Sequence, residues 1–245
     1  MTGWAPKGIG AIVQARMGSQ RLAGKVLMRL GGKPLLQYLV ERLEHSCLAG
    51  HIVVATSGEA SDDAIADFCR GHGVRCHRGP LANVASRFLE VLDLCRFEAF
   101  VRINGDSPLL DPRLIDQAVS IFVNREFDMV TNVRPRTYPA GQSVEVVAAA
   151  AFRRGYGRML DPQDLEHVTK YFYNHAGDFK IFNLAAPRDY SAVHLAVDTH
   201  RDLEVVGDIL ARLKKPHWEY GLEEIVEIYR QVTGGPRGDG LHAAS

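Results

Sequence analysis

The sequence predicts an α/β fold with a mostly parallel, mixed sheet and helices on both faces. In the first half of the 245-residue chain, short apolar runs alternate with segments of helical periodicity. Four such strand–helix units in a row favour a parallel sheet, because parallel neighbours are usually joined by a crossover helix. Hydrophobic residues make up 46% of the chain and charged residues 24%, enough to bury a sizeable core.

Each predicted element of the first half follows from its apolar pattern. Strands are expected at residues 9–14, 51–55, 74–77 and 99–103. Helices are expected at residues 34–46, from Ser61 as an N-cap onward, and at residues 83–95 and 111–124. Because the carboxyl ends of parallel strands meet at one edge, the polar loops that follow these strands should converge there.

The second half has a more mixed pattern. Strands are expected at residues 127–132, 143–147, 179–184 and 193–197, and helices at residues 161–175, 201–213 and 219–232. No repeat or low-complexity linker divides the chain. We therefore expect one domain over residues 1–233, with an extra lobe at 137–175 and a flexible tail at 234–245.

The bulk composition argues against several kinds of partner. Lysine plus arginine equals aspartate plus glutamate at 29 each, so the overall positive charge of a nucleic-acid-binding or membrane-surface protein is absent. No stretch reaches the roughly 18 apolar residues of a membrane span, and the N-terminus lacks a signal-peptide pattern. The four cysteines form no C-x-x-C pair. We expect a cytoplasmic protein with reduced thiols, no zinc, no nucleic-acid partner and no membrane insertion.

The segment after the first strand combines cations with glycines. Arg16, Arg21 and Lys25 supply positive charge, and Gly18 and Gly24 let the backbone approach an anion. The spacing is not that of a P-loop, because five residues separate these glycines and a valine follows the lysine. From these residues alone, a triphosphate-binding loop and a basic surface loop are equally open.

Two aspartates follow predicted strands. Asp106 lies in a Gly-Asp-Ser-Pro turn, where a carboxylate is well placed to hold Mg²⁺ against phosphates. Asp198 ends the strand expected at 193–197. The alternatives are that Asp106 caps its own turn and that Asp198 caps the helix that follows. Together with the cation loop, the two carboxylates favour a phosphate and metal site.

These residues resemble the cytidylyltransferase family of spore-coat polysaccharide biosynthesis, which is related to the enzymes that make CMP-sialic acid and CMP-Kdo. The family's first motif, IxQARxGSxRLPGK, matches IVQARMGSQRLAGK at residues 12–25, and RIxGDxPLxD matches RINGDSPLLD at residues 102–111. Supporting matches are GGKPLL at 31–36, VVATS at 53–57, DDAIA at 62–66, EHVT at 166–169 and VDT at 197–199. The likeness covers most of the chain.

The resemblance implies a nucleotide-diphospho-sugar transferase-like, Rossmann-like fold and a Mg²⁺-dependent cytidylyltransferase. Such an enzyme transfers CMP from CTP to a sugar or sugar-acid acceptor and releases pyrophosphate. The implied catalytic residues are Arg16, Lys25 and Asp106, and the implied metal ligands are Asp106 and Asp198. The implied nucleotide contacts are Ala11, Ala15, Arg16, Gly18, Ser19, Arg21, Lys25, Thr56, Arg87, Asn104 and Asp106. The implied acceptor contacts are Tyr138, Gln142, Glu145, Glu166 and His167. Of these, Arg87 could equally be a solvated helix residue.

The chain departs from the family pattern on the acceptor side. Relatives often read RTYPDGLDVE where this chain reads RTYPAGQSVE at residues 136–145, so Ala140 and Ser143 replace two acids. The loss of two carboxylates leads us to expect a different, more acidic acceptor.

Three functions remain open on the sequence alone. The first is CMP transfer from CTP, and the second is the same reaction with UTP or GTP, since base pockets of this kind are built largely from backbone groups. The third is a non-catalytic nucleotide-sugar-binding protein, against which the retained Lys25, Asp106 and Asp198 argue. Relatives are commonly homodimers, and residues 137–175, rich in Tyr and Phe, are either a dimerisation surface or ordinary core.

Overall fold

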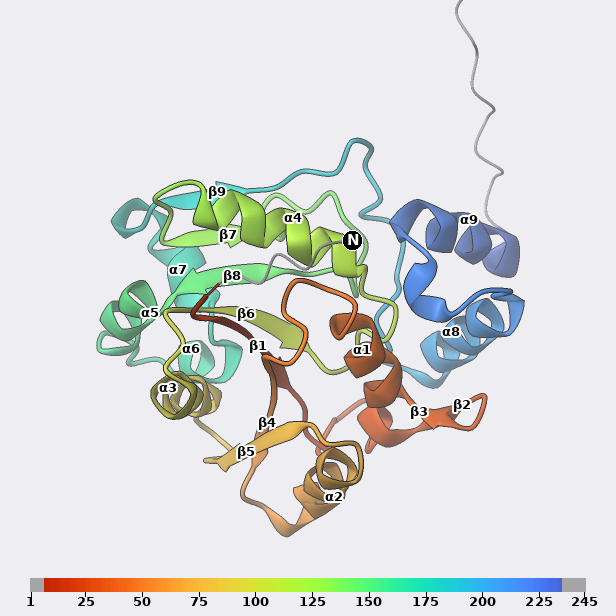
Figure 1. The fold of residues 1–245 in the computed structure, drawn as a ribbon, viewed down its shortest axis with the longest axis horizontal. Helices are drawn as coiled ribbons and strands as arrows, with labels where there is room; N and C mark the ends of the chain where they lie inside the picture. Colours follow the sequence, from red (N-terminus) through yellow and green to blue (C-terminus); the bar gives the residue numbers. More distant parts are fainter. Residues whose placement is uncertain (1–6, 235–245) are drawn as a thin grey trace, which may run out of the picture.

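The fold is built on one mixed sheet of seven strands. A computed structural model describes residues 7–234, so nearly all of the tail predicted at 234–245 lies outside the described residues. The strand order is β5-β4-β1-β6-β8-β7-β9 (Figure 1). A separate two-stranded hairpin is formed by β2 (Arg29–Leu30) and β3 (Lys33–Pro34).

The four strands of the first half are parallel to one another, as predicted. They are β1 (Ile9–Gln14), β4 (Ile52–Ser57), β5 (Arg75–Gly79) and β6 (Ala99–Asn104). The second half extends this sheet with β7 (Met129–Thr131), β8 (Glu145–Ala148) and β9 (Ile181–Asn183). Strand β8 runs antiparallel to both β6 and β7, which makes the sheet mixed.

Helices cover both faces of the sheet because successive strand residues point to opposite faces. One core cluster joins the strands to α1 (Leu35–Leu43), α2 (Asp63–Gly71) and α4 (Pro112–Val123). The opposite cluster joins them to α3 (Val84–Cys95), α5 (Ala149–Tyr156) and α7 (Lys170–Asn174). A third cluster packs α8 (His200–Arg212) against α9 (Leu222–Thr233) beside the sheet (Figure 1).

Two predicted helices need correction. Ser61 is not an N-cap: it lies in a 3-10 turn, Ala60–Asp62, and the buried Asp62 immediately precedes α2. The helix expected at 161–175 is two short helices, α6 (Pro162–His167) and α7, because Val168 has a positive φ of 53° that no helix accommodates. Periodicity does not report such a break, since the apolar spacing continues across it.

Two more differences concern the second half. The segment 193–197, expected to be a strand, does not pair with the seven-stranded sheet. Its His194 makes only an isolated bridge to Ala140. Helix α5 was not expected, because its small and apolar residues continue the run of strand β8. No helix among the described residues is both long and apolar enough to span a bilayer.

The carboxyl ends of β1, β4 and β6 lie side by side. Gln14 is in register with Ala55 on one side and Asn104 on the other. The chain leaves β6 through Gly105, whose N–H donates to the Gln14 carbonyl at 2.9 Å. A Cβ atom at Gly105 would lie 3.0 Å from both Ala15 Cβ and the Gln14 carbonyl oxygen, so a side chain there would push the two loops apart.

Candidate active site

The cation loop between β1 and Lys25 is held by its own backbone and by one buried carboxylate. The Met17 carbonyl accepts hydrogen bonds from Ser19 N (2.9 Å) and Gly24 N (2.8 Å). The Met17 N–H donates to Asp62 Oδ1 at 2.7 Å, and Asp62 also accepts from the backbone and hydroxyl of Ser57. Asp62 thus ties the loop to the end of β4, two elements that are distant in sequence.

Lys25 lies between the two aspartates that follow predicted strands. Its Nζ atom is 2.6 Å from Asp106 Oδ2 and 2.9 Å from Asp198 Oδ1, and only 8% of the residue is exposed. Burial alone would lower the pKa of Lys25, but the neighbouring carboxylates of Asp106 and Asp198 outweigh it and raise the pKa. Lys25 is therefore a fixed cation between the two carboxylates.

The tertiary structure decides between the two interpretations of Asp198. The N-cap of α8 is Thr199, whose side chain accepts from Asp202 N while the Asp202 carboxylate accepts from Thr199 N. Asp198 is therefore free to face Lys25 and Arg21, to which it is 2.9 Å distant. Asp106 lies opposite and makes no turn-closing bond of its own to the backbone of the described residues; its carboxylate pairs with Lys25 instead.

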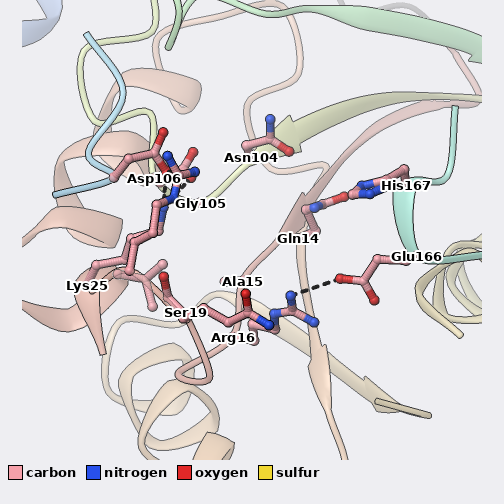
Figure 2. Close-up of a pocket in the computed structure, with 14 residues that line it drawn as sticks. Gln14, Ala15, Arg16, Ser19, Lys25, Asn104, Gly105, Asp106, Glu166 and His167 are labelled. Carbon is pink, nitrogen blue, oxygen red and sulfur yellow. Dashed lines mark hydrogen bonds and ion pairs between the residues drawn. The ribbon is translucent and has the colours of Figure 1, made fainter. Parts of the chain in front are cut away.

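A cavity of about 510 Å³ opens above these residues at the carboxyl edge of the sheet (Figure 2). Its lining includes polar side chains from four parts of the chain. These are Gln14, Arg16, Ser19, Gln20, Arg21, Lys25, Asn104, Asp106, Glu166, His167 and Asp198. Lys25 and Asp106 lie at one end of the cavity in Figure 2, and Glu166 and His167 at the other. Arg16 reaches across to Glu166, with 2.9 Å between the guanidinium and the carboxylate (Figure 2).

Arg87 is not a solvated helix residue. It is 2% exposed and lines a small cavity of about 70 Å³ with Ala15, Val84 and Glu166. Its only hydrogen bond within the described residues is a long one, 3.5 Å from Nη1 to the Ala55 carbonyl, and its Nε atom has none. Burial lowers the pKa of Arg87. A buried, under-bonded guanidinium carries a cost unless a ligand supplies an acceptor.

A second cavity, of about 270 Å³, adjoins the first. Asn104 and His167 line both. On its floor the buried Glu145 accepts from Arg102 Nη1 at 2.6 Å and from the Tyr173 hydroxyl. Burial and the Glu145 charge raise the pKa of Tyr173, so this phenol stays protonated as a donor.

Three further cations surround the second cavity without a carboxylate partner among the described residues. Arg134 stacks on the Tyr173 ring at 5.4 Å, and Arg136 donates to the Pro139 carbonyl (3.3 Å) and the Ser143 hydroxyl (3.2 Å). Lys170 donates to the Gln163 side chain. Ser143 lines this cavity, whereas Ala140 does not. The second cavity therefore has an excess of positive charge.

Several predicted contact residues lie elsewhere. Tyr138 is 4% exposed and part of the core. Gln142 is fully buried, and its amide accepts from Asp111 N (2.9 Å) and donates to the Leu109 carbonyl (2.7 Å). Neither lines the second cavity, and their contact with the acceptor stays a prediction.

On the nucleotide side, two buried residues and one exposed glycine fall outside the cavity lining. Ala11 and Thr56 are fully buried in β1 and β4, and Gly18 is exposed on the loop. None of them lines the cavities described above. The remaining predicted nucleotide residues gather at the first cavity or at the Arg87 cavity.

Three contributors to the site stand inside the family motifs but were assigned no role from the sequence. Arg102 and Gln14 interact across the sheet (3.0 Å from Nε to Oε1) and join the two cavities, and Asp62 supports the loop. The available signal for Arg102 was a charged residue inside an otherwise apolar strand. Asp62 begins the DDAIA motif at 62–66, but the motif does not reveal its role, because that role depends on a contact 45 residues away.

The fold and the site together define an α/β protein with a cation-lined cavity at the carboxyl edge of its sheet, and comparison with known proteins identifies its family. The sequence profile of the cytidylyltransferase family matches residues 10–232, and the chain belongs to that family. It is 35% identical to the spore coat polysaccharide biosynthesis protein SpsF of Bacillus subtilis over 206 residues, covering 80% of this chain and 83% of that protein. It is 30% identical to the 3-deoxy-manno-octulosonate cytidylyltransferase of Geobacter sulfurreducens, covering 94% and 88%.

Solved structures show the same fold. A cytidylyltransferase from Leptospira borgpetersenii superimposes with a TM-score of 0.89 at 26% identity, covering 96% of this chain and 99% of that one. A CMP-2-keto-3-deoxy-manno-octonic acid synthetase solved with CTP superimposes with a TM-score of 0.62 at 19% identity, covering 84% and 99%. The predicted nucleotide-diphospho-sugar transferase-like fold is confirmed.

Proposed function

We propose that this chain transfers CMP from CTP to a hydroxyl group of a sugar or sugar-acid acceptor, with release of pyrophosphate, in the synthesis of glycan precursors. The observation that carries the proposal is the adjoining pair of cavities, which share Asn104 and His167. A nucleotide in the first cavity would present its α-phosphate to an acceptor in the second. The relatives named above include a 3-deoxy-manno-octulosonate cytidylyltransferase, which supports this class of reaction.

The phosphates belong at the end of the first cavity where the cations gather. Arg21 and Lys25 supply countercharge there and Ser19 adds a hydroxyl, while Arg16, whose guanidinium pairs with Glu166, lines the cavity from the other side. Displacement at a phosphate needs positioning and neutralisation of charge rather than a covalent nucleophile. In this arrangement the cations hold the β- and γ-phosphates and stabilise the departing pyrophosphate.

Asp106 and Asp198 are suited to hold the Mg²⁺ that we propose as cofactor. Their carboxylates converge on one point, the Lys25 Nζ atom, so a cation already occupies the space between them. Two carboxylates are enough for this ion, because Mg²⁺ is usually held by one or two carboxylates together with substrate phosphates. When bound, the metal supplies countercharge to phosphate oxygens.

Replacing Asp106 tests the proposed metal role. Asp106→Asn is expected to lower kcat by about 10²-fold or more, since the site loses a charge that must balance in the transition state. Asp93→Asn, an exposed carboxylate paired only with Arg153, is the matched control. Unchanged Mg²⁺-dependent turnover in Asp106→Asn would exclude Asp106 as a metal ligand.

The acceptor that we propose carries a negative charge. Arg134, Arg136 and Lys170 have no carboxylate partner among the described residues, while Glu145 is neutralised by Arg102. A cavity with this balance favours a carboxylate or phosphate on the acceptor, because charge-assisted hydrogen bonds from arginine are strong and directional.

The deciding experiment measures pyrophosphate release with each of CTP, UTP, GTP and ATP in the presence of Mg²⁺. The acceptors are neutral sugars, sugar acids and sugar phosphates. We expect release with CTP and an anionic acceptor. Release with another nucleotide would assign the base differently, and the absence of nucleotide binding in a thermal-shift assay would favour the non-catalytic alternative.

A further inference from the structure

The turn between α6 and α7 has a strained backbone. Val168 has φ 53° and ψ −58°, and the Thr169 N–H donates to the His167 carbonyl across it, which is the geometry of a γ-turn. For a β-branched residue this conformation is a genuine outlier. The Val168 side chain is fully buried in the core cluster that contains Phe172, and this packing holds the turn in place. Strain of this kind concentrates at functional sites.

The strained turn lies where the two cavities meet. Before it, Glu166 faces the first cavity and pairs with Arg16. After it, Thr169 and Lys170 face the second cavity, and Thr169 Oγ1 accepts from Arg102 Nη1 at 3.1 Å. His167 lies between them as the last residue of α6 and lines both cavities. A regular helix through residue 168 would not place consecutive residues on both cavities in this way.

The imidazole of His167 has no hydrogen-bond or ion-pair partner within residues 7–234, and the residue is exposed to the cavities. The carboxylates that line the same cavities are all engaged. Glu166 pairs with Arg16, Glu145 with Arg102, and Asp106 and Asp198 with Lys25. Of the described lining residues, His167 is thus the side chain best able to accept a proton.

The position of His167 also suits an in-line displacement. Figure 2 shows it across the cavity from Lys25 and Asp106, where the proposed function places the pyrophosphate end of the nucleotide. In phosphoryl-type transfer the attacking and leaving oxygens lie roughly in line. An acceptor hydroxyl that attacks from the second cavity would therefore approach the α-phosphorus on the His167 side.

We propose that His167 is the general base of the reaction. This inference rests on the proposed function. In the step, a ring nitrogen of His167 takes the proton of the acceptor hydroxyl as its oxygen forms a bond to the α-phosphorus. The bond from the α-phosphorus to the bridging oxygen of pyrophosphate breaks, and pyrophosphate leaves with the bonding electron pair. The strained turn keeps the imidazole at the junction of the cavities.

The test compares His167→Gln and His167→Ala with the wild-type chain. A positioned general base contributes about 10²–10⁴-fold, so kcat should fall by that factor in both variants while KM for CTP changes little. Added imidazole should restore part of the kcat of His167→Ala, which a purely structural role would not allow. His51→Gln, an exposed histidine at the opposite edge of the sheet, is the control and should keep wild-type kcat.

Each result has a defined meaning. A kcat near the wild-type value in His167→Gln overturns the assignment, as does a loss of kcat in His167→Ala that imidazole leaves unchanged. In those cases the wild-type chain still releases pyrophosphate from CTP, so the proposed function stands. A wild-type chain that binds no CTP overturns the proposed function itself and the base assignment with it.

Discussion

At the scale of single residues, the site contains buried charges that the surrounding protein satisfies only in part. Arg87 is the clearest example, because it is buried with one long hydrogen bond and forms no ion pair within the described residues, although Glu166 lines the same small cavity. Burying a guanidinium under these conditions opposes folding. It lines the small cavity with Ala15 and Glu166, and its contact with the nucleotide stays a prediction.

Replacing Arg87 should therefore separate stability from binding. In Arg87→Met we expect a thermal unfolding midpoint equal to or above that of the wild type, because an under-bonded buried charge is removed. We expect the Kd for CTP to rise by about 10- to 100-fold, the value of a hydrogen bond to a charged group. Thermal melts measure the unfolding midpoint, and titration calorimetry measures the Kd for CTP. A variant that melts earlier and binds CTP as before would assign Arg87 to the core alone.

Ala140 and Ser143, which replace two acids of the family pattern at residues 136–145, can be tested one at a time. Ser143 contacts Arg136 in the second cavity, whereas Ala140 lies outside its lining. Ser143→Asp should neutralise Arg136 and raise KM for an anionic acceptor by about tenfold or more. Ala140→Asp should leave the KM for this acceptor nearly unchanged, and the double variant should have the same KM as Ser143→Asp. An unaltered acceptor preference in all three would refute the idea that the lost acids set specificity.

At the scale of elements, the site depends on loops tied to strand ends by a few buried polar groups. Asp62 connects the cation loop to β4, and Gly24, with φ 69°, lets the chain turn into the short helix Lys25–Leu27. The γ-turn at Val168 splits one predicted helix into two. Each of these features depends on a contact or a backbone angle that the conformational preferences of neighbouring residues do not predict.

Asp62 should make the stability of the fold sensitive to acid. Burial opposes its charge, but hydrogen bonds from Met17 and Ser57 lower the pKa of Asp62 below its usual value. Its stabilising contribution is therefore fully present above the unfolded pKa of about 3.9 and is lost as pH falls through the lower folded value.

Asp62→Asn is expected to reduce the free energy of unfolding near neutral pH by about 1–3 kcal/mol and to flatten its decline in acid. Denaturant titrations from about pH 2 to about pH 7, which is roughly the range in which a carboxyl group titrates, measure the free energy of unfolding and its decline in acid. Asp67→Asn, an exposed residue on the same helix α2, is the control. Equal acid profiles for the wild type and Asp62→Asn would show that the carboxylate is not a stabilising anion.

At the scale of the whole molecule, the homodimer remains a prediction. The aromatic residues of 137–175 that suggested a dimer surface are largely core: Tyr138, Tyr171 and Phe172 are buried. Leu160, which is 91% exposed, is the large apolar side chain of that segment that faces outward. Light scattering should give about twice the chain mass of 27.1 kDa for a dimer through this segment, and Leu160→Asp should lower it. A single-chain mass in both would refute the prediction.

The sequence by itself determined the fold class, because the alternation of apolar strands and amphipathic helices leaves few topologies for a parallel sheet. It also identified most of the first cavity, since Arg16, Lys25 and Asp106 lie in contiguous motifs at strand ends. Only the tertiary structure decided that Lys25 joins Asp106 to Asp198, that Arg87 is buried, that Tyr138 and Gln142 belong to the core, and that the γ-turn places His167 between two cavities. The physical reason is range: periodicity and spacing report interactions along a few turns of chain, whereas these features depend on charges, packing and hydrogen bonds between segments far apart in sequence.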